Sequence, residues 1–387
     1  MQAVINSIFG KLKGDKVIWL TVLGLSVFSL LAVYSSTESL AFRMAGGSLF
    51  YYLAKHFFVL GLGIVVMYLS HLVDYKYYSR LSQIFLWISI PLLIYTLIFG
   101  VNLNEARRWI QIPVINLTFQ TSDFAKLALI MYTARVLSKK QREIKKFKEA
   151  FVPIILPIVI VCGLIAPADL SSAALLFVTC LIIMFIGRVN MKHILATILS
   201  GFLVLAMIIG ILSVSENSGR LETWKQRIED FRTDKDGPYQ IQQAKIAIAK
   251  GGIVRIAPGK STQRNYLPHP YSDFIYAIII EEWGLLGGAV ILGLYLLLLW
   301  RCIKIVMASP RAFGALLAVG LGFSLVIQAL INMGVNVHLL PVTGLTLPMV
   351  SMGGSSIWFT GLAFGIILSV SRNIEEMKAL KQTELSE

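Results

Sequence analysis

The segment Leu267-Pro268-His269-Pro270-Tyr271-Ser272-Asp273-Phe274-Ile275-Tyr276-Ala277 joins a proline-rich polar loop to an apolar run that continues to residue 300. Such a run is long enough to cross a bilayer as a helix, which takes about 17–25 residues. Asp273 stands at the junction, so we expect it at the boundary between water and lipid. A carboxylate at that height could act as an acid or base on a polar group carried by a lipid.

The composition indicates a polytopic membrane protein. Of the 387 residues, 56% are hydrophobic and 14% are charged, and a soluble protein of this size cannot bury so much apolar surface. The sequence predicts an all-α fold of about ten transmembrane helices in one membrane-embedded domain, residues 1–387. The expected spans are residues 17–35, 50–70, 81–100, 122–137, 151–167, 169–187, 194–213, 273–300, 312–335 and 351–371.

The net charge of +14 is distributed as in a membrane protein, and nucleic acid is not an expected partner. Lys and Arg concentrate in every second segment between spans, whereas the alternate short loops carry only Arg43, Arg107 and Arg108. Because cytoplasmic segments are enriched in Lys and Arg, both termini are expected in the cytoplasm. Residues 372–387 then form a cytoplasmic tail.

Cysteine and histidine give no indication of a metal centre or a disulfide. Cys162, Cys180 and Cys302 lie in or beside spans without a Cys-X-X-Cys pattern, so we interpret them as packing residues. The five histidines are scattered without metal-ligand spacing.

Residues 214–272 form a large extracytoplasmic loop between the seventh and eighth spans. Two helices are expected in it, over Trp224–Phe231 and Tyr239–Lys250, the second ended by Gly251-Gly252. The loop carries ten Lys and Arg residues. Loops of this length are uncommon unless functional, so a lid over a polyanionic headgroup is favoured over a solvated loop.

A second external loop, Val101–Thr121, contains Glu105-Ala106-Arg107-Arg108-Trp109-Ile110. The two arginines have two interpretations. They are interfacial anchors beside the tryptophan, or they clamp a pyrophosphate, because Arg binds phosphate in a bidentate manner.

Charged residues also stand inside or beside spans. Asp123 and Lys126 are three residues apart and share one helix face. Helix capping by Ser122 or Asp123 explains the acid but not the lysine, which must pair or line a water-filled cavity, and the cavity is favoured. Asp169 is either a functional acid or an N-cap. Glu281 lies about 12 Å deeper than Asp273 and is interpreted as a supporting or ion-pair residue, with Lys126 as the candidate partner.

Leu340–Pro348 is apolar but contains two prolines and Gly344, so it cannot form a regular span. Irregular backbone at membrane depth is stable only when it is buried in protein or lines a cavity. The small residues of Ser351–Ser356 allow close approach of another helix or a ligand.

Four motifs follow one another along the chain: Ala106–Ile110, Gln120–Lys126, Ser272–Ala277 with Glu281–Gly284, and Leu340–Gly344 with Gly353–Ser356. In this order and within ten spans, they resemble the SEDS family of shape, elongation, division and sporulation proteins, which includes FtsW and RodA. The resemblance covers nearly the whole chain. The stretch from Arg220 to Ile228 is more similar to FtsW than to RodA.

The chain departs from the family pattern at a few positions. Thr121 replaces a usual proline, Asp123 a usual glutamate and Met352 a common tyrosine. The side chain of Asp123 is one methylene shorter than the usual glutamate, while the acid before the eighth span is intact.

The resemblance implies a peptidoglycan glycosyltransferase that polymerises lipid II into β-1,4-linked strands during septal cell-wall synthesis. The family's essential acid falls on Asp273, the expected general base of an inverting reaction on a GlcNAc 4-hydroxyl. Cations would stabilise the pyrophosphate leaving group. The expected substrate-binding residues are Arg107, Arg108, Asp123, Lys126, Asp169 and Glu281.

No tightly bound cofactor is expected; a divalent cation, Mg²⁺ or Mn²⁺, is kept as an alternative without assigned ligands. The implied partners are lipid II, an undecaprenyl-pyrophosphate-linked glycan, a class B penicillin-binding protein (a transpeptidase) and other divisome membrane proteins. The implied location is the cytoplasmic (inner) membrane at the division septum. Two other functions stay open: a lipid II flippase, because charges in spans and a broken helix suit transport equally well, and a non-catalytic division scaffold.

Overall fold

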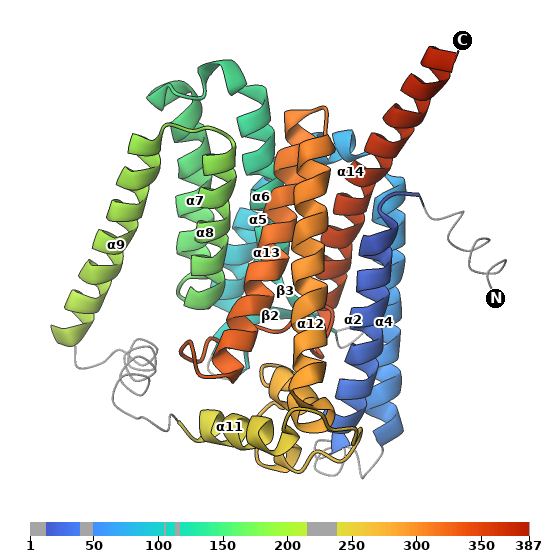
Figure 1. Ribbon diagram of the computed structural model, residues 1–387. Coiled ribbons are helices and arrows are strands. Elements are labelled where there is room, and N and C mark those ends of the chain that lie inside the picture. The colour runs from blue at the N-terminus through green and yellow to red at the C-terminus, as the bar shows by residue number, and fades with distance from the viewer. Residues whose placement is uncertain (1–12, 39–48, 104–105, 113–116, 215–237, 387) are drawn as a thin grey trace.

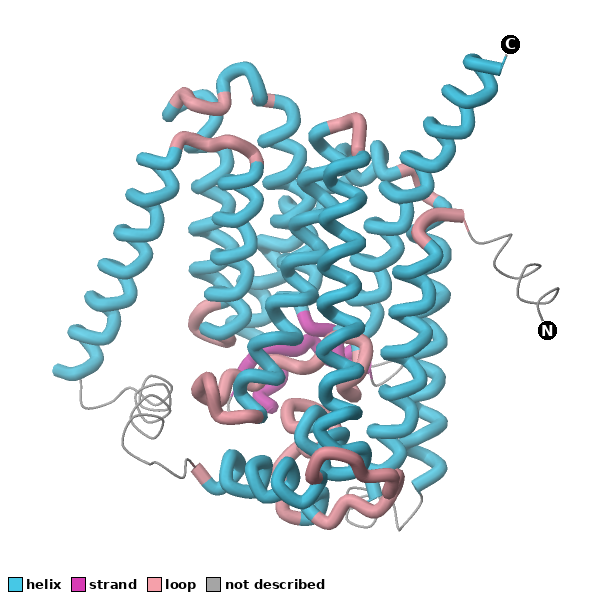
Figure 2. Tube along the Cα trace, in the orientation of Figure 1, coloured by secondary structure: helices cyan, strands magenta, loops and turns pink. Residues whose placement is uncertain are grey.

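The computed structural model describes residues 13–38, 49–103, 106–112, 117–214 and 238–386, and within these ranges the chain is mainly helical (Figures 1 and 2). Each of the ten expected spans contains a helix. These helices are α2 (Lys16–Ser36), α4 (Leu49–Leu72), α5 (Tyr75–Phe99), α6 (Thr121–Lys139), α7 (Val152–Ile165), α8 (Leu170–Ile186), α9 (Met191–Val214), α12 (Ile275–Ala308), α13 (Ala312–Asn336) and α14 (Ser355–Ser386).

Seven of the described helical segments are long and apolar enough to cross a membrane. The apolar helix α8 is shorter, at 17 residues. Helix α6 carries more charge and lies against α5, α7, α8 and α13, so its apolar face is buried in protein. The chain is therefore a multi-pass membrane protein, as its composition predicts.

The two ends of the described chain lie at the same end of the bundle (Figure 1). Lys13 Nζ is 3.3 Å from a carboxylate oxygen of Glu376, and Gly14 N–H donates to Glu375 at 2.9 Å. At the same end, Asp15 caps α2 and forms an ion pair with Arg301 at 2.6 Å. This agrees with the predicted even number of spans, and the placement of that end in the cytoplasm stays a prediction.

At the opposite end, the segment expected as the external loop Val101–Thr121 contains a small antiparallel sheet, drawn magenta in Figure 2. Its strands are β1 (Val101–Leu103), β2 (Ala106–Ile112) and β3 (Leu117–Gln120), in the order β1-β2-β3. Trp109 is paired with Gln120, and Ile110 with Phe119. Aromatic and β-branched residues favour this conformation. The sheet leads directly into α6.

Helix α12 is broken at Gly284, which has φ 71° and ψ −177°, so the expected continuous span over residues 273–300 is corrected. The amide groups freed by the break are satisfied by the segment after α11 (Tyr239–Gly251): Leu285 N–H donates to Gly252 C=O at 2.9 Å and Leu286 N–H to Ile253 C=O at 3.1 Å. A Cβ at Gly284 would lie 2.6 Å from the Ile253 oxygen, so only glycine fits.

Helix α11 confirms the expected second helix of the 214–272 loop, and it ends as predicted, with Gly252 at φ 58°. It lies across the end of the bundle against α12 (Figure 1). The first expected helix of that loop, Trp224–Phe231, lies outside the described residues. The same holds for the FtsW-like stretch from Arg220 to Ile228.

Candidate functional site

Asp273 lies immediately before the N-cap of α12, which is Phe274. Its side chain is half-buried, and its Oδ1 accepts a hydrogen bond from Ser272 Oγ at 2.9 Å. The position lies within the reach of the positive end of the helix dipole, which favours a carboxylate. The structure thus confirms that Asp273 lies at a loop-to-helix junction at one end of the bundle.

The irregular segment between α13 and α14, residues 337–354, packs against this junction. Met352 N–H donates to Tyr271 C=O at 2.9 Å, and Ser351 Oγ donates to Ser272 C=O at 2.7 Å. A Cβ placed on Gly344, whose φ is 73°, would lie 3.8 Å from Asp273 Oδ2. The prediction that this apolar, proline-containing segment is not a regular span is confirmed.

Two residues that the sequence analysis missed also hold the junction. The buried amides of Asn332 and Asn336, on α13, donate to the carbonyl oxygen of Asp273 at 2.9 and 3.0 Å. Two asparagines four residues apart, in a span whose other polar side chains are only Ser324 and Gln328, were the available signal, because a buried amide is costly unless it is hydrogen-bonded.

The phenol of Tyr271 lies beside the candidate acid. Burial raises the pKa of Tyr271, and the negative charge of Asp273 raises it further. The hydroxyl lies 3.3 Å from His269 Nδ1. Tyr271 is therefore a neutral phenol at physiological pH, next to the carboxylate.

Asp123 and Lys126 form a nearly buried ion pair in the first turn of α6, with Nζ 2.7 Å from Oδ1. The helix begins at Thr121 and its N-cap is Gln120, so neither Ser122 nor Asp123 caps it. The structure thus contains the ion pair that the sequence analysis ranked below a cavity.

A cavity is present as well. It has a volume of about 40 Å³ and lies between α6, α13 and α14. Asp123 Oδ2 is buried and has no hydrogen-bond partner among the described residues. The space is enough for a few water molecules, since one needs about 10–15 Å³. Its polar lining residues are Asp123, Lys126, Ser324, Gln328, Ser356 and Thr360.

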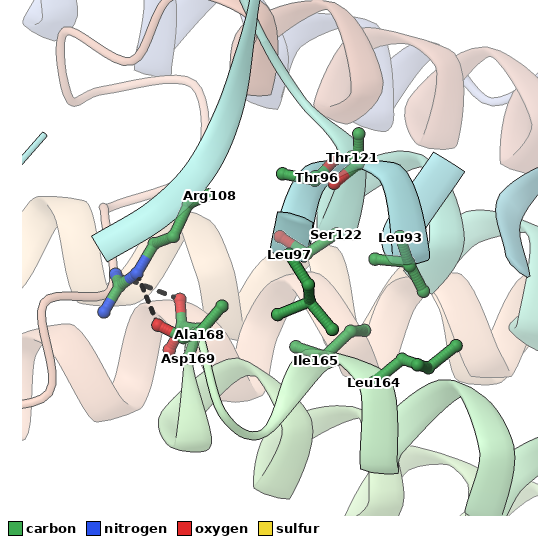
Figure 3. A pocket seen from close by; sticks show the side chains of 10 residues that line it. All are labelled: Leu93, Thr96, Leu97, Arg108, Thr121, Ser122, Leu164, Ile165, Ala168 and Asp169. Carbon is green, nitrogen blue, oxygen red and sulfur yellow. Dashed lines mark hydrogen bonds and ion pairs between the residues drawn. The ribbon is translucent and has the colours of Figure 1, made fainter. Parts of the chain in front are cut away.

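Arg108 reaches from β2 to the turn between α7 and α8 (Figure 3). Its Nε donates to Ala168 C=O at 2.8 Å, and a terminal nitrogen lies 3.2 Å from Asp169 Oδ2. Asp169 also caps α8, because its Oδ1 accepts from Ser172 N–H at 3.0 Å. The N-cap interpretation of Asp169 is confirmed. The side chain of Arg107 lies outside the described residues.

Glu281 does not pair with Lys126, so that expectation is wrong. Its buried carboxylate accepts hydrogen bonds from Ser261 Oγ, from Thr262 N–H and Oγ1, both at 3.0 Å, and from Gln263 N–H at 3.3 Å. The neighbouring Glu282 accepts from Ser261 N–H at 3.1 Å and from Ser35 Oγ. The break at Gly284 explains this, because Glu281 lies on the short helical piece that faces the loop.

Residues 352–355 contact both the Asp273 junction and the beginning of α6, where Asp123 and Lys126 lie. The Tyr271 carbonyl is bonded to Met352, and three residues later Ser355 Oγ accepts from Gln120 N–H at 3.0 Å. Gln120 Nε2 in turn donates to Ser122 Oγ at 3.0 Å, at the beginning of α6. The Asp273 junction and the Asp123–Lys126 pair are therefore connected through residues 352–355.

No group of three or more His, Cys, Asp or Glu side chains suited to a metal occurs within the described ranges.

The chain is similar to solved structures over nearly its whole length. One belongs to a study of polymerization and crosslinking by a peptidoglycan synthase complex: TM-score 0.72, 24% identity, covering 93% of this chain and 98% of that one. Another is the rod shape determining protein RodA of Thermus thermophilus: TM-score 0.67, 25% identity, covering 94% and 98%.

Curated relatives are similar in sequence. Stage V sporulation protein E of Bacillus subtilis is 34% identical over 368 residues, which is 94% of this chain and 98% of the relative. A protein of Trichlorobacter lovleyi named probable peptidoglycan glycosyltransferase FtsW is 32% identical over 383 residues, covering 97% of each chain. The family model for FtsW, RodA and SpoVE, described as cell cycle protein, matches residues 15–376. The chain therefore belongs to the FtsW/RodA/SpoVE family of cell cycle proteins, the SEDS family.

Proposed function

We propose that the chain is a peptidoglycan glycosyltransferase that polymerises lipid II into β-1,4-linked strands, with Asp273 as the general base. The observation that carries the proposal is the position of Asp273. It is a half-buried carboxylate at the N-terminal end of α12, on the end of the bundle that α11 covers. Relatives about 32% identical over nearly the full length, named probable peptidoglycan glycosyltransferase FtsW, support the reaction class.

In the proposed reaction, Asp273 takes the proton from the GlcNAc 4-hydroxyl of lipid II. The oxygen attacks the anomeric carbon of the terminal MurNAc of the growing strand and displaces undecaprenyl pyrophosphate with inversion. The carboxylate becomes a carboxylic acid, and the pyrophosphate leaves without needing a proton donor. Positive groups that stabilise the leaving charge would supply much of the remaining rate.

The structure constrains which cations could serve. Lys126 is paired with Asp123 and Arg108 with Asp169, so each pair is close to neutral before substrate binds. An ammonium has three donors and a guanidinium five, so both retain donors for phosphate oxygens. We assign the pyrophosphate to Lys126, Arg108 and Arg107, with Mg²⁺ or Mn²⁺ as an additional counter-ion to be tested by chelation.

The test is polymerisation of lipid II by purified, reconstituted protein, with and without a partner transpeptidase. Asp273→Ala and the isosteric Asp273→Asn should lower the rate of strand formation by about 10²–10⁴-fold, the usual worth of a general base. Asp74→Asn is the matched control, because Asp74 caps α5 in the turn after α4, away from Asp273. A wild-type rate in Asp273→Ala would refute the assignment.

A lipid II flippase is the alternative that specific observations favour. The break of α12 at Gly284 and the buried Asp123–Lys126 pair are features that transporters use. Labelled lipid II that crosses the vesicle membrane without forming strands would favour this reading. A non-catalytic scaffold would tolerate Asp273→Ala in cells.

The proposed partner is a class B penicillin-binding protein that cross-links the strands. A fold shared with a structure titled for polymerization and crosslinking by a peptidoglycan synthase complex supports it. Other divisome membrane proteins and a septal location in the inner membrane belong to the same proposal. Co-purification of a tagged chain with a transpeptidase, and its position in dividing cells, would test them.

A further inference from the structure

Three consecutive carbonyl groups before α12 are each held by α13 or by the segment that follows it. The Tyr271 oxygen accepts from Met352 N–H, and the Ser272 oxygen accepts from Ser351 Oγ. The Asp273 oxygen accepts from the side-chain amides of both Asn332 and Asn336. A carbonyl oxygen has two lone pairs, so these two donors fill its ordinary capacity.

The Asn336 amide is inserted between two groups that would otherwise close a helical turn. Its Nδ2 donates to Asp273 C=O at 3.0 Å, while its Oδ1 accepts from Ala277 N–H at 3.1 Å. Residues 273 and 277 are four apart, which is the pair that an α-helix beginning one turn earlier would join. Asn336 therefore acts as a wedge at the first turn of α12.

Asn332 holds both Asn336 and Asp273 C=O through hydrogen bonds. Its Nδ2 donates to Asp273 C=O at 2.9 Å and to Leu345 C=O at 2.7 Å, and its backbone carbonyl accepts from Asn336 Nδ2 at 2.8 Å. Both asparagines are at most 1% exposed. The network ties the acid-bearing peptide to the loop that places Gly344 beside the carboxylate.

We propose that Asn332 and Asn336 are positioning residues that keep Asp273 out of the helix and aim its carboxylate, an inference that rests on the proposed function of Asp273. Ala277 N–H already donates to Phe274 C=O at 3.1 Å, and without the Asn336 amide it can turn to Asp273 C=O, which keeps its bond from Asn332. The helix then gains a turn at its N-terminus, and the Asp273 side chain rotates with the backbone. The protein loses little stability, because Ala277 N–H keeps Phe274 C=O as an acceptor and Asp273 C=O keeps Asn332 as a donor, but the carboxylate of Asp273 is no longer held in its orientation.

The test compares Asn336→Ala with the matched control Asn190→Ala. Asn190 is also an asparagine whose Oδ1 accepts a backbone N–H, from Lys192 at 3.1 Å in front of α9. Asn336→Ala should lower kcat for strand formation by up to about 10²-fold, the cost of a misplaced catalytic group, with KM and melting temperature close to wild type. Asn336→Asp, which keeps the acceptor but lacks both donors, should lose activity likewise.

Loss of melting temperature with an unchanged kcat per folded molecule would overturn the inference, because that is the signature of a merely structural asparagine. So would a wild-type kcat in Asn336→Ala. If the wild-type protein forms no glycan strands from lipid II, that result would instead reject the proposed function.

A second readout needs no activity. In an Asp273→Cys background, Asn336→Ala should change the rate of maleimide labelling at position 273 by about tenfold, because thiol reactivity follows exposure and local charge. Asn190→Ala should not change it. An equal labelling rate in both backgrounds would overturn the inference whether or not lipid II is the substrate.

Discussion

Replacement of Lys126 by Met separates a structural ion pair from a cation that serves the substrate. The variant keeps the length of the side chain but leaves Asp123 as an uncompensated buried carboxylate. Both side chains are nearly buried, at 12% and 8% exposure. Breaking a buried pair in this way costs about 3–5 kcal/mol. Because Asp123 borders a cavity that can admit water, we expect the lower end, about 3 kcal/mol.

Such a loss reduces the ratio of folded to unfolded protein by roughly 150-fold, since each 1.4 kcal/mol is about a factor of ten. The double variant Asp123→Asn, Lys126→Met removes both charges and should recover most of the free energy of unfolding. The assay is equilibrium unfolding in mixed micelles with increasing SDS, followed by circular dichroism. Lys146→Met is the matched control, because Lys146 pairs with Glu149 on an exposed surface and should leave stability unchanged.

A Lys126→Met protein as stable as wild type would refute the assignment of a buried pair. A double variant no more stable than the single one would refute it equally. The activity of the double variant then decides the second question. If Lys126 stabilises the leaving pyrophosphate, the stable double variant stays impaired in strand formation; if the pair is only structural, activity returns with stability.

Three further predictions concern the elements around the site. Glu281→Ala removes the acceptor of two backbone N–H groups, at Thr262 and Gln263. Amide hydrogen exchange over residues 261–264 should therefore accelerate by at least about tenfold, while residues in α4 keep their exchange rates. Unchanged exchange would show that Glu281 does not anchor the loop. Gly284→Ala places a Cβ 2.6 Å from a carbonyl oxygen at a residue with positive φ, so it should lower the melting temperature by several degrees. Gly293→Ala, with open space around the added Cβ, should not lower it. Equal melting temperatures of the two variants would contradict the break in α12. Tyr271 has a pKa above its ordinary value of 10.0, so its phenol stays neutral in the folded protein. Its contribution to stability is present below pH 10 and is lost as the pH rises through the raised pKa. The difference in absorbance at 295 nm between wild type and Tyr271→Phe should therefore develop only above about pH 10, and ionisation below that pH would contradict the burial of the phenol.

Most of the membrane-spanning helices were predictable because they are long apolar runs with polar ends, and length and hydropathy are local properties of the chain. The end of α11 at Gly251-Gly252 and the N-cap at Asp169 were predictable for the same reason, since capping involves neighbours in sequence. The irregular segment after α13 followed from its prolines. Asp273 could be singled out because it interrupts an apolar pattern at a loop-to-helix boundary.

The expectations that the structure overturns depend on contacts between residues distant in sequence. Glu281 was expected near Lys126 because an unbroken α12 would place it deep in the bundle, yet Gly284 breaks the helix only because the segment after α11 is there to bond the freed amides. The sequence predicts a loop where the structure has the sheet of β1, β2 and β3, since the strand pairing and the bond to Ser355 join segments that local patterns do not connect.

The sequence by itself determined the membrane class, the positions of the spans and the identity of the acid at residue 273, because these depend on hydropathy and on residue type along short stretches. Only the tertiary structure decided which charges are paired and what holds the Asp273 peptide. Asn332 and Asn336 reach that peptide from a helix about sixty positions away, as their bonds to its carbonyl show. Hydrogen-bond energy depends on distance and angle between groups, and those exist only once the helices have packed.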